Sequence, residues 1–165
     1  MAIAEKKDIR EAVWHMLTGQ HEFTDATRTS AQLDVRRLIE DAVFKGRRPP
    51  PEKTSEFVLM LVDDVERIMS FSREINCAKT RLEFRCHSKS PDRSELIWQG
   101  IRKMLSSFKG TVTLKSGTMH IGGCMPDGEV ETDPEQKLDA SDDFDHVYVG
   151  YFSIIHEITT PSGTS

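Results

Sequence analysis

The chain has 165 residues, of which 37% are hydrophobic and 30% are charged, the ordinary balance of a globular domain. Lys and Arg number 22 against 27 Asp and Glu, a net charge of -5, whereas proteins that grip duplex DNA usually carry a basic excess. The longest apolar run, 57–62, has six residues, far short of the ~20 that cross a bilayer. We therefore expect a protein that is cytosolic, or carried in something assembled in the cytosol, without a membrane span and without bulk affinity for DNA.

The first half of the chain predicts a helix, a weaker helix and a buried strand. Apolar residues recur at helical spacing from Lys7 to Leu17, before Gly19. A weaker helical pattern runs from 33 to 43 and ends before Gly46 and the proline run 49–51. The segment 56–62 is apolar on both faces and predicts a buried strand that stops at Asp63 and Asp64. The next segment, 63–76, fits either a long two-stranded hairpin extension or a loop.

The second half gives cleaner patterns. Residues 78–86 alternate between apolar and charged, which predicts a half-buried strand. Ser90 and Pro91 mark the start of a helix with an apolar stripe to Phe108, closed by Gly110. Strands 111–115 and 118–121 flank a Ser116-Gly117 turn, and 147–158 predicts a long central strand.

This order of elements predicts an α+β domain over residues 1–158: two layers, with a mostly antiparallel sheet and helices packed on one face. The remaining residues, 159–165, are predicted to form a disordered tail.

Charge is segregated along the chain. Between Asp127 and Asp145 there are nine acidic residues and one lysine, a net of -8, so the remainder carries +3. We expect this acidic segment to be an exposed loop. An arginine pair precedes the proline run, and the segment 63–76 is polar. Separate charged surfaces suit contacts with copies of the same chain or with a partner. The candidate interface residues are Arg47, Arg48, Asp63, Asp64, Glu66, Arg67, Arg73, Asp127, Glu129, Asp142 and Asp143.

Motifs that could carry chemistry are sparse. Pro126-Asp127 followed by Glu135-Gln136-Lys137 matches the acid and lysine spacing of Mg²⁺-dependent nucleases, but Pro134 and a shortage of apolar residues argue against the strand pair that such a site needs. No glycine-rich nucleotide loop or nucleophile elbow is present, so we expect no enzyme activity and no cofactor. The three cysteines form no CxxC pair. Cys86, His87, His120 and Cys124 could bind zinc only with a bulge, so a buried cysteine and an exposed histidine are expected instead.

The layout resembles the tail terminator, or tail completion, proteins of long-tailed phages, the family of the lambda minor tail protein U. The shared features are the helix DIREAVWHML, the turn VFKGRRPPPE, the strands EFVLMLVDD and AKTRLEFRC, the helix SPDRSELIWQGIRKML, an acidic segment and the closing strand HVYVGYFSIIHEI.

The resemblance implies a structural virion protein at the top of the tail tube, assembled in the host cytoplasm. It implies a homo-oligomeric ring, a hexamer, that caps the tube, ends its elongation and offers a surface for head-tail joining. Its partners would be copies of itself, the major tail tube protein and a head completion or connector protein, and DNA would pass through the lumen without specific binding. The alternatives are another connector or neck ring protein, or the nuclease described above.

Overall fold

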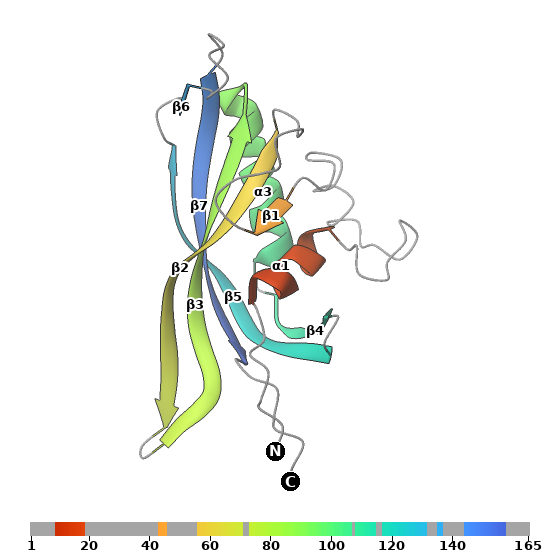
Figure 1. Ribbon diagram of the computed structural model, residues 1–165, viewed down its shortest axis with the longest axis vertical. Helices are drawn as coiled ribbons and strands as arrows, with labels where there is room; N and C mark the ends of the chain where they lie inside the picture. Colours follow the sequence, from red (N-terminus) through yellow and green to blue (C-terminus); the bar gives the residue numbers. More distant parts are fainter. Residues whose placement is uncertain are drawn as a thin grey trace.

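The computed structural model describes residues 9–18, 43–45, 56–70, 73–106, 108–114, 117–131, 135–136 and 144–157. The elements are α1 (Ile9–Thr18), β1 (Val43–Lys45), β2 (Phe57–Ser70), β3 (Arg73–Ser88), α3 (Pro91–Leu105), β4 (Gly110–Leu114), β5 (Gly117–Glu131), β6 (Glu135–Gln136) and β7 (Phe144–Glu157). The strands form one sheet in the order β1-β2-β3-β7-β5-β4, and β6 pairs with β7. All pairs are antiparallel except β1 with β2, so the sheet is mixed and the α+β class is confirmed (Figure 1).

A single cluster of buried side chains joins the helices to the sheet. It takes Ala12, Val13 and Leu17 from α1 and Ile97 and Ile101 from α3. It also takes even-numbered side chains from neighbouring strands, because successive residues of a strand point to opposite faces. These strand residues include Val58, Met60, Leu82, Phe84, Phe152 and Ile154.

Trp98 is the largest fully buried side chain of this core. Its ring lies 6.0 Å from the Phe84 ring and 5.4 Å from the Phe152 ring, measured between centroids. It rests directly on Gly150 of β7, where a Cβ atom would overlap three ring carbons. The indole N–H donates to the Glu129 carboxylate, so the buried donor is satisfied. Together these contacts fix α3 against β7.

Several predicted elements are confirmed. The amphipathic helix is α1, the alternating segment 78–86 lies within β3, and β7 is central because β3 and β5 flank it. Ser90 caps α3 by accepting a hydrogen bond from the Arg93 amide at 3.4 Å, with Pro91 in the first turn.

Other boundaries were wrong. Asp63 and Asp64 do not stop β2, which continues to Ser70 and forms the long hairpin with β3. The helix predicted to end near Val43 gives way there to β1, because a parallel pairing with β2 decides the conformation of these three residues. α3 ends at Leu105, five residues before Gly110, and Phe108 packs on the core from outside the helix. Gly117 pairs with Leu114 and so belongs to β5 rather than to the turn.

The acidic segment is also partly strand. β5 runs through Asp127 to Glu131, and β6 and the start of β7 take four more of its residues. An exposed edge strand tolerates charge on both faces, so acidity did not exclude a strand here. The rest of that segment, the proline run, most of the weak helix and the tail 159–165 lie outside the described residues.

Candidate functional site

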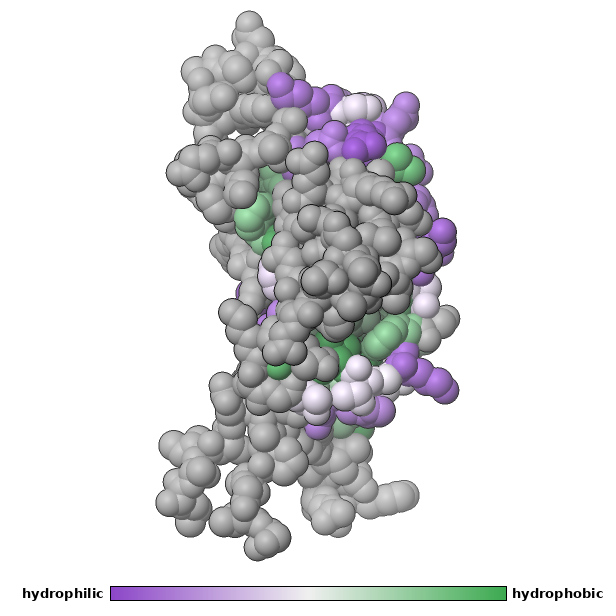
Figure 2. Space-filling model, turned by 90° about the vertical axis from the view of Figure 1, so that its right-hand side faces the viewer, coloured by the Kyte–Doolittle hydropathy of each residue, from purple (hydrophilic) through white to green (hydrophobic). Residues whose placement is uncertain are grey.

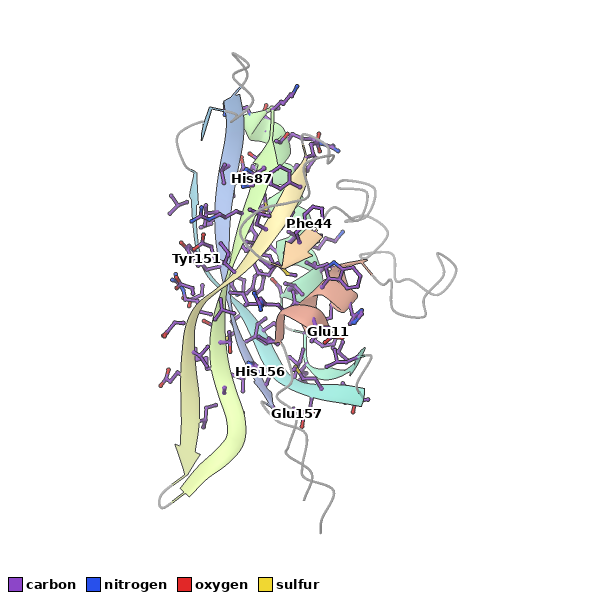
Figure 3. The ribbon with its side chains drawn as sticks, viewed as in Figure 1. Glu11, Phe44, His87, Tyr151, His156 and Glu157 are labelled. Carbon is purple, nitrogen blue, oxygen red and sulfur yellow. The ribbon has the colours of Figure 1, made fainter. Side chains whose placement is uncertain are left out.

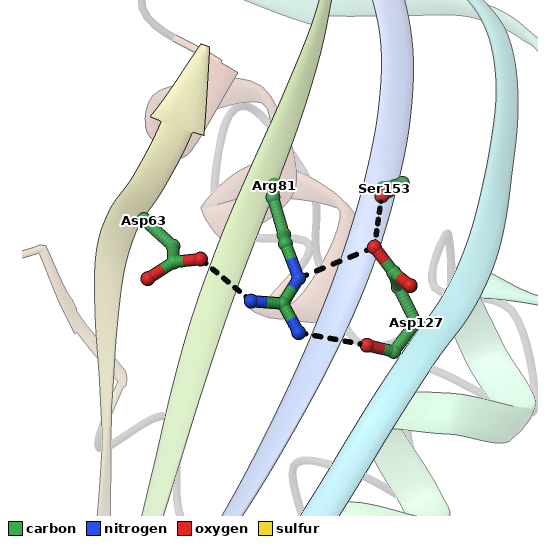
Figure 4. A network of polar contacts seen from close by, with 4 residues as sticks. All are labelled: Asp63, Arg81, Asp127 and Ser153. Carbon is green, nitrogen blue, oxygen red and sulfur yellow. Dashed lines mark hydrogen bonds and ion pairs between the residues drawn. The ribbon is translucent and has the colours of Figure 1, made fainter.

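A network around Arg81 crosses four strands on the face away from the core. The Arg81 guanidinium donates to Asp63 Oδ2 of β2 at 2.7 Å and to Asp127 Oδ2 of β5 at 3.2 Å. It donates again to the Asp127 carbonyl at 3.0 Å, and its Cζ lies 3.8 Å from the centre of the Tyr151 ring. Ser153 of β7 donates its hydroxyl to Asp127 at 2.6 Å. One cation therefore ties β2, β3, β7 and β5 together (Figure 4).

Two β-bulges deliver the carboxylates to this cation. In the β2–β3 ladder, Val62 pairs with Leu82 and Asp64 with Arg81, so Asp63 is an extra residue. In the β5–β7 ladder, the register shifts between Pro126 and Glu129. This second bulge contains Asp127 and Gly128, whose φ of +108° favours glycine. A bulge re-aims side chains, which is how Asp127 reaches across β7 to Arg81.

Electrostatics follow from these contacts. The hydrogen bond from Ser153, with the Arg81 charge, holds the pKa of Asp127 below its usual range. The bond to Asp63 raises the pKa of Arg81, so the guanidinium stays charged at all ordinary pH. Burial, with the Glu83 charge, raises the pKa of Tyr151, whose ring lies on the sheet side away from the helices (Figure 3). The network thus pairs a charged Arg81 guanidinium with a charged Asp127 carboxylate near neutral pH.

Among the described residues, each outer strand of this four-stranded section is unpaired along part of its outer edge. β1 covers the free side of β2 only at Val58–Met60, and β4 covers that of β5 only at 117–121. No further described strand pairs with the free sides of 61–70 and 122–131. Such edges present rows of backbone donors and acceptors to another chain.

Exposed apolar side chains are concentrated on these edges. Among the described residues, five large hydrophobic side chains are exposed; four are Val62 and Val65 on β2 and Met125 and Val130 on β5, with exposed fractions of 43% to 56%. The fifth is Leu96 on α3. From the helix side, hydrophobic side chains of the described residues show only in small, separate areas (Figure 2). Within the described ranges, most of the large exposed apolar side chains therefore lie on the two edge strands.

The structure brings together only part of the predicted interface. Asp63 and Asp127 meet at Arg81, and Asp64 and Glu66 are exposed on the β2 edge. Glu129 points instead to α3, where it accepts from Trp98 and lies 3.9 Å from the Arg102 guanidinium. The backbone of Arg67 and Arg73 lies at the far end of the β2–β3 hairpin. The other predicted positions lie outside the described residues: Arg47, Arg48, Asp142 and Asp143.

The residues of the nuclease motif are not brought together in the described part of the chain. Asp127 bonds to Ser153 of β7, whereas Glu135 pairs with Asp145, eight residues away along the same strand. At about 3.3 Å per residue this separation is roughly 25 Å, too far for two ligands of one ion. Lys137 lies outside the described residues, and no three potential metal ligands cluster among those described.

Of the described cysteine and histidine residues, Cys86, Cys124, His87 and His156 are buried in the fold. Cys86 and Cys124 are buried, and burial raises the pKa of both thiols, that of Cys124 to about 12. The prediction that His87 is exposed was wrong, because its ring stacks on Phe57 at 4.4 Å and is 8% exposed. Burial, with the Arg85 charge, lowers the pKa of His87 to about 4. His156 is buried as well and lies 2.7 Å from the Thr80 hydroxyl.

The residues that sequence reasoning missed are Arg81, Tyr151 and Ser153. Arg81 belongs to an alternating strand whose charged face the sequence predicts, so its exposure could be anticipated. Its partners could not, because Asp127 lies 46 residues away and reaches Arg81 only through the bulge.

Comparison with known proteins yields a likeness of fold. No protein-family model matches the chain, and no curated protein matches its sequence. One solved chain is similar in structure with a TM-score of 0.56 over 87% of this chain and 91% of that chain, at 13% identity. It comes from a structure described as the virion of a native gene transfer agent particle. No helix in the described part of the chain is both long and apolar enough to span a membrane.

Proposed function

We propose that this chain is a structural subunit of a phage-like virion, a tail terminator that assembles side by side into a closed ring on the end of the tail tube. The observation that carries the proposal is the four-stranded section β2-β3-β7-β5, which among the described residues is unpaired along part of each edge and exposes two large apolar side chains on each edge strand. The fold likeness to a chain from a gene transfer agent virion supports a role in a particle.

Strand directions favour a ring over a simple dimer. Each neighbouring pair in the section is antiparallel, so β2 and β5 run in opposite directions. A second copy placed alongside in the same orientation would set its β5 antiparallel to β2 and continue the alternation. Contacts between two different surfaces close into a ring when the rotation from each copy to the next divides a full turn with no rise along the axis, and otherwise give an open filament.

The finer features of the proposal come from the resemblance to tail terminators. The ring is a hexamer, and the two ring faces meet the major tail tube protein and a head completion protein. From the order of the elements, the helices cover one face of the sheet. DNA passes through the lumen without specific binding, for which the net charge of -5 is suitable. The chain carries out no catalysis.

Tube length provides the test. Tail tube subunits polymerised with increasing amounts of the purified protein are expected to give shorter tubes by electron microscopy, each with a cap. Tubes of unchanged length, with the protein bound elsewhere or unbound, would indicate a different neck ring or an adaptor.

A nuclease assay completes this test. Incubation with linear DNA and Mg²⁺ should leave the DNA intact, and cleavage that is lost in Lys137→Ala would contradict the structural role.

A further inference from the structure

The two edges that the proposed ring brings together are both acidic. The exposed part of β2 carries Asp63, Asp64 and Glu66, and that of β5 carries Asp127 and Glu129. Like charges on paired strands oppose their association, and the repulsion grows as water is excluded between them. Ring closure through these edges therefore needs their charge to be compensated within each subunit.

Arg81 provides that compensation to both edges at once. It pairs with Asp63 at 2.7 Å and with Asp127 at 3.2 Å, while the Tyr151 ring supports the guanidinium from β7. Glu129 is engaged separately by Trp98 and Arg102. Three of these five exposed carboxylates thus have a partner inside their own chain.

We propose that Arg81 is a positioning residue for assembly: by neutralising one carboxylate on each open edge, it permits β2 of one copy to pair with β5 of a second copy. The occupant of each edge is the same chain. This inference rests on the proposed function, since it names the contact through which the ring closes.

Arg85 offers a matched control. It lies on the same strand and face, four residues along, and pairs with Glu83 of its own strand. Arg81→Gln and Arg85→Gln remove the same charge from the same face, and the first removes the ion pairs with Asp63 and Asp127.

The experiment measures oligomer mass by sedimentation velocity and native mass spectrometry over a range of concentrations and salt. Wild type is expected to assemble, and Arg85→Gln to match it within about twofold in dissociation constant. Arg81→Gln should raise the dissociation constant about tenfold or more, because loss of one partner leaves a charge unpaired in a closed contact. Its defect should shrink in 1 M salt, where the screening length falls to about 3 Å.

A rescue variant separates charge from folding. Arg81→Gln combined with Asp63→Asn and Asp127→Asn removes the repulsion together with the cation, and should restore assembly to within about threefold of wild type. Three results would overturn the role of Arg81 and leave the ring intact. Arg81→Gln could assemble as well as wild type, Arg85→Gln could show an equal defect, or the triple variant could fold and stay monomeric. Wild type that remains monomeric both alone and with tube subunits would overturn the ring itself, and this inference with it.

Discussion

Replacement of Gly150 by alanine should be among the most destabilising single-methyl changes in the chain. The added Cβ would overlap three carbons of the Trp98 ring, which lies directly on the β7 backbone. The ring cannot simply move aside, because Phe84 and Phe152 pack against it and Glu129 holds its N–H. Overpacking of a filled core typically costs about 1 to 3 kcal/mol, and this pinned ring places Gly150→Ala at the upper end, about 3 kcal/mol.

Gly123→Ala is the matched control. Position 123 lies on the neighbouring strand β5, and a Cβ there would meet nothing within 4 Å. Its effect on the free energy of unfolding should stay within about 0.5 kcal/mol. The assay is urea unfolding followed by tryptophan fluorescence and circular dichroism, with melting temperatures as a second measure. For a chain of this size, Gly150→Ala should melt roughly 6 to 12 °C below wild type.

Trp98→Leu in the same background tests the mechanism. If overlap with the ring is the cause, the double variant should lose less stability than the sum of the two single variants. Two results would refute the packing argument. The free energies of unfolding of Gly150→Ala and Gly123→Ala could differ by less than about 1 kcal/mol, or the losses of Gly150→Ala and Trp98→Leu could simply add.

Three further changes test other parts of the structure. His87 is neutral in the folded and the unfolded chain above about pH 6.5. Because its pKa in the folded chain is about 4, acid favours the unfolded chain. The free energy of unfolding should therefore fall by about 2 to 3 kcal/mol between pH 6.5 and 4. His87→Phe should flatten that part of the stability curve measured by urea unfolding, and an unchanged slope would contradict the buried placement. Ser90→Ala removes the cap of α3 and should cost about 1 kcal/mol in the same assay. A thiol reagent should modify the partly exposed Cys77 well before the buried Cys86 and Cys124; simultaneous reaction of all three without denaturant would be the contrary result.

Sequence patterns correctly predicted those helices and strands whose local sequence favours the same conformation as their packing in the fold. The alternation in 78–86 survives because β3 is covered on one face only, and the Ser90 cap is a local contact within one helical turn. The stripe on α3 predicted the buried positions Ile97 and Ile101 for the same reason.

The failures have a different origin. The acidic residues predicted a strand end at Asp63 and a loop after Asp127. Both residues lie instead in bulged edge strands, where a charged side chain stays exposed and can pair with a cation. The Arg81 network depends on the register of three antiparallel pairings, and register is a property of the whole sheet. For that reason the sequence predicted Asp63 and Asp127 as candidate interface residues without showing that both pair with Arg81.

Cryo-electron microscopy of the intact particle tests the central claim most directly. The account predicts density for this chain in a closed ring on the head-proximal end of the tail tube, with Val62 to Glu66 of each copy beside Met125 to Val130 of the next. Three results would contradict the account: density for a single copy, a ring at another level of the particle, or a ring joined through the helices with both strand edges in solvent.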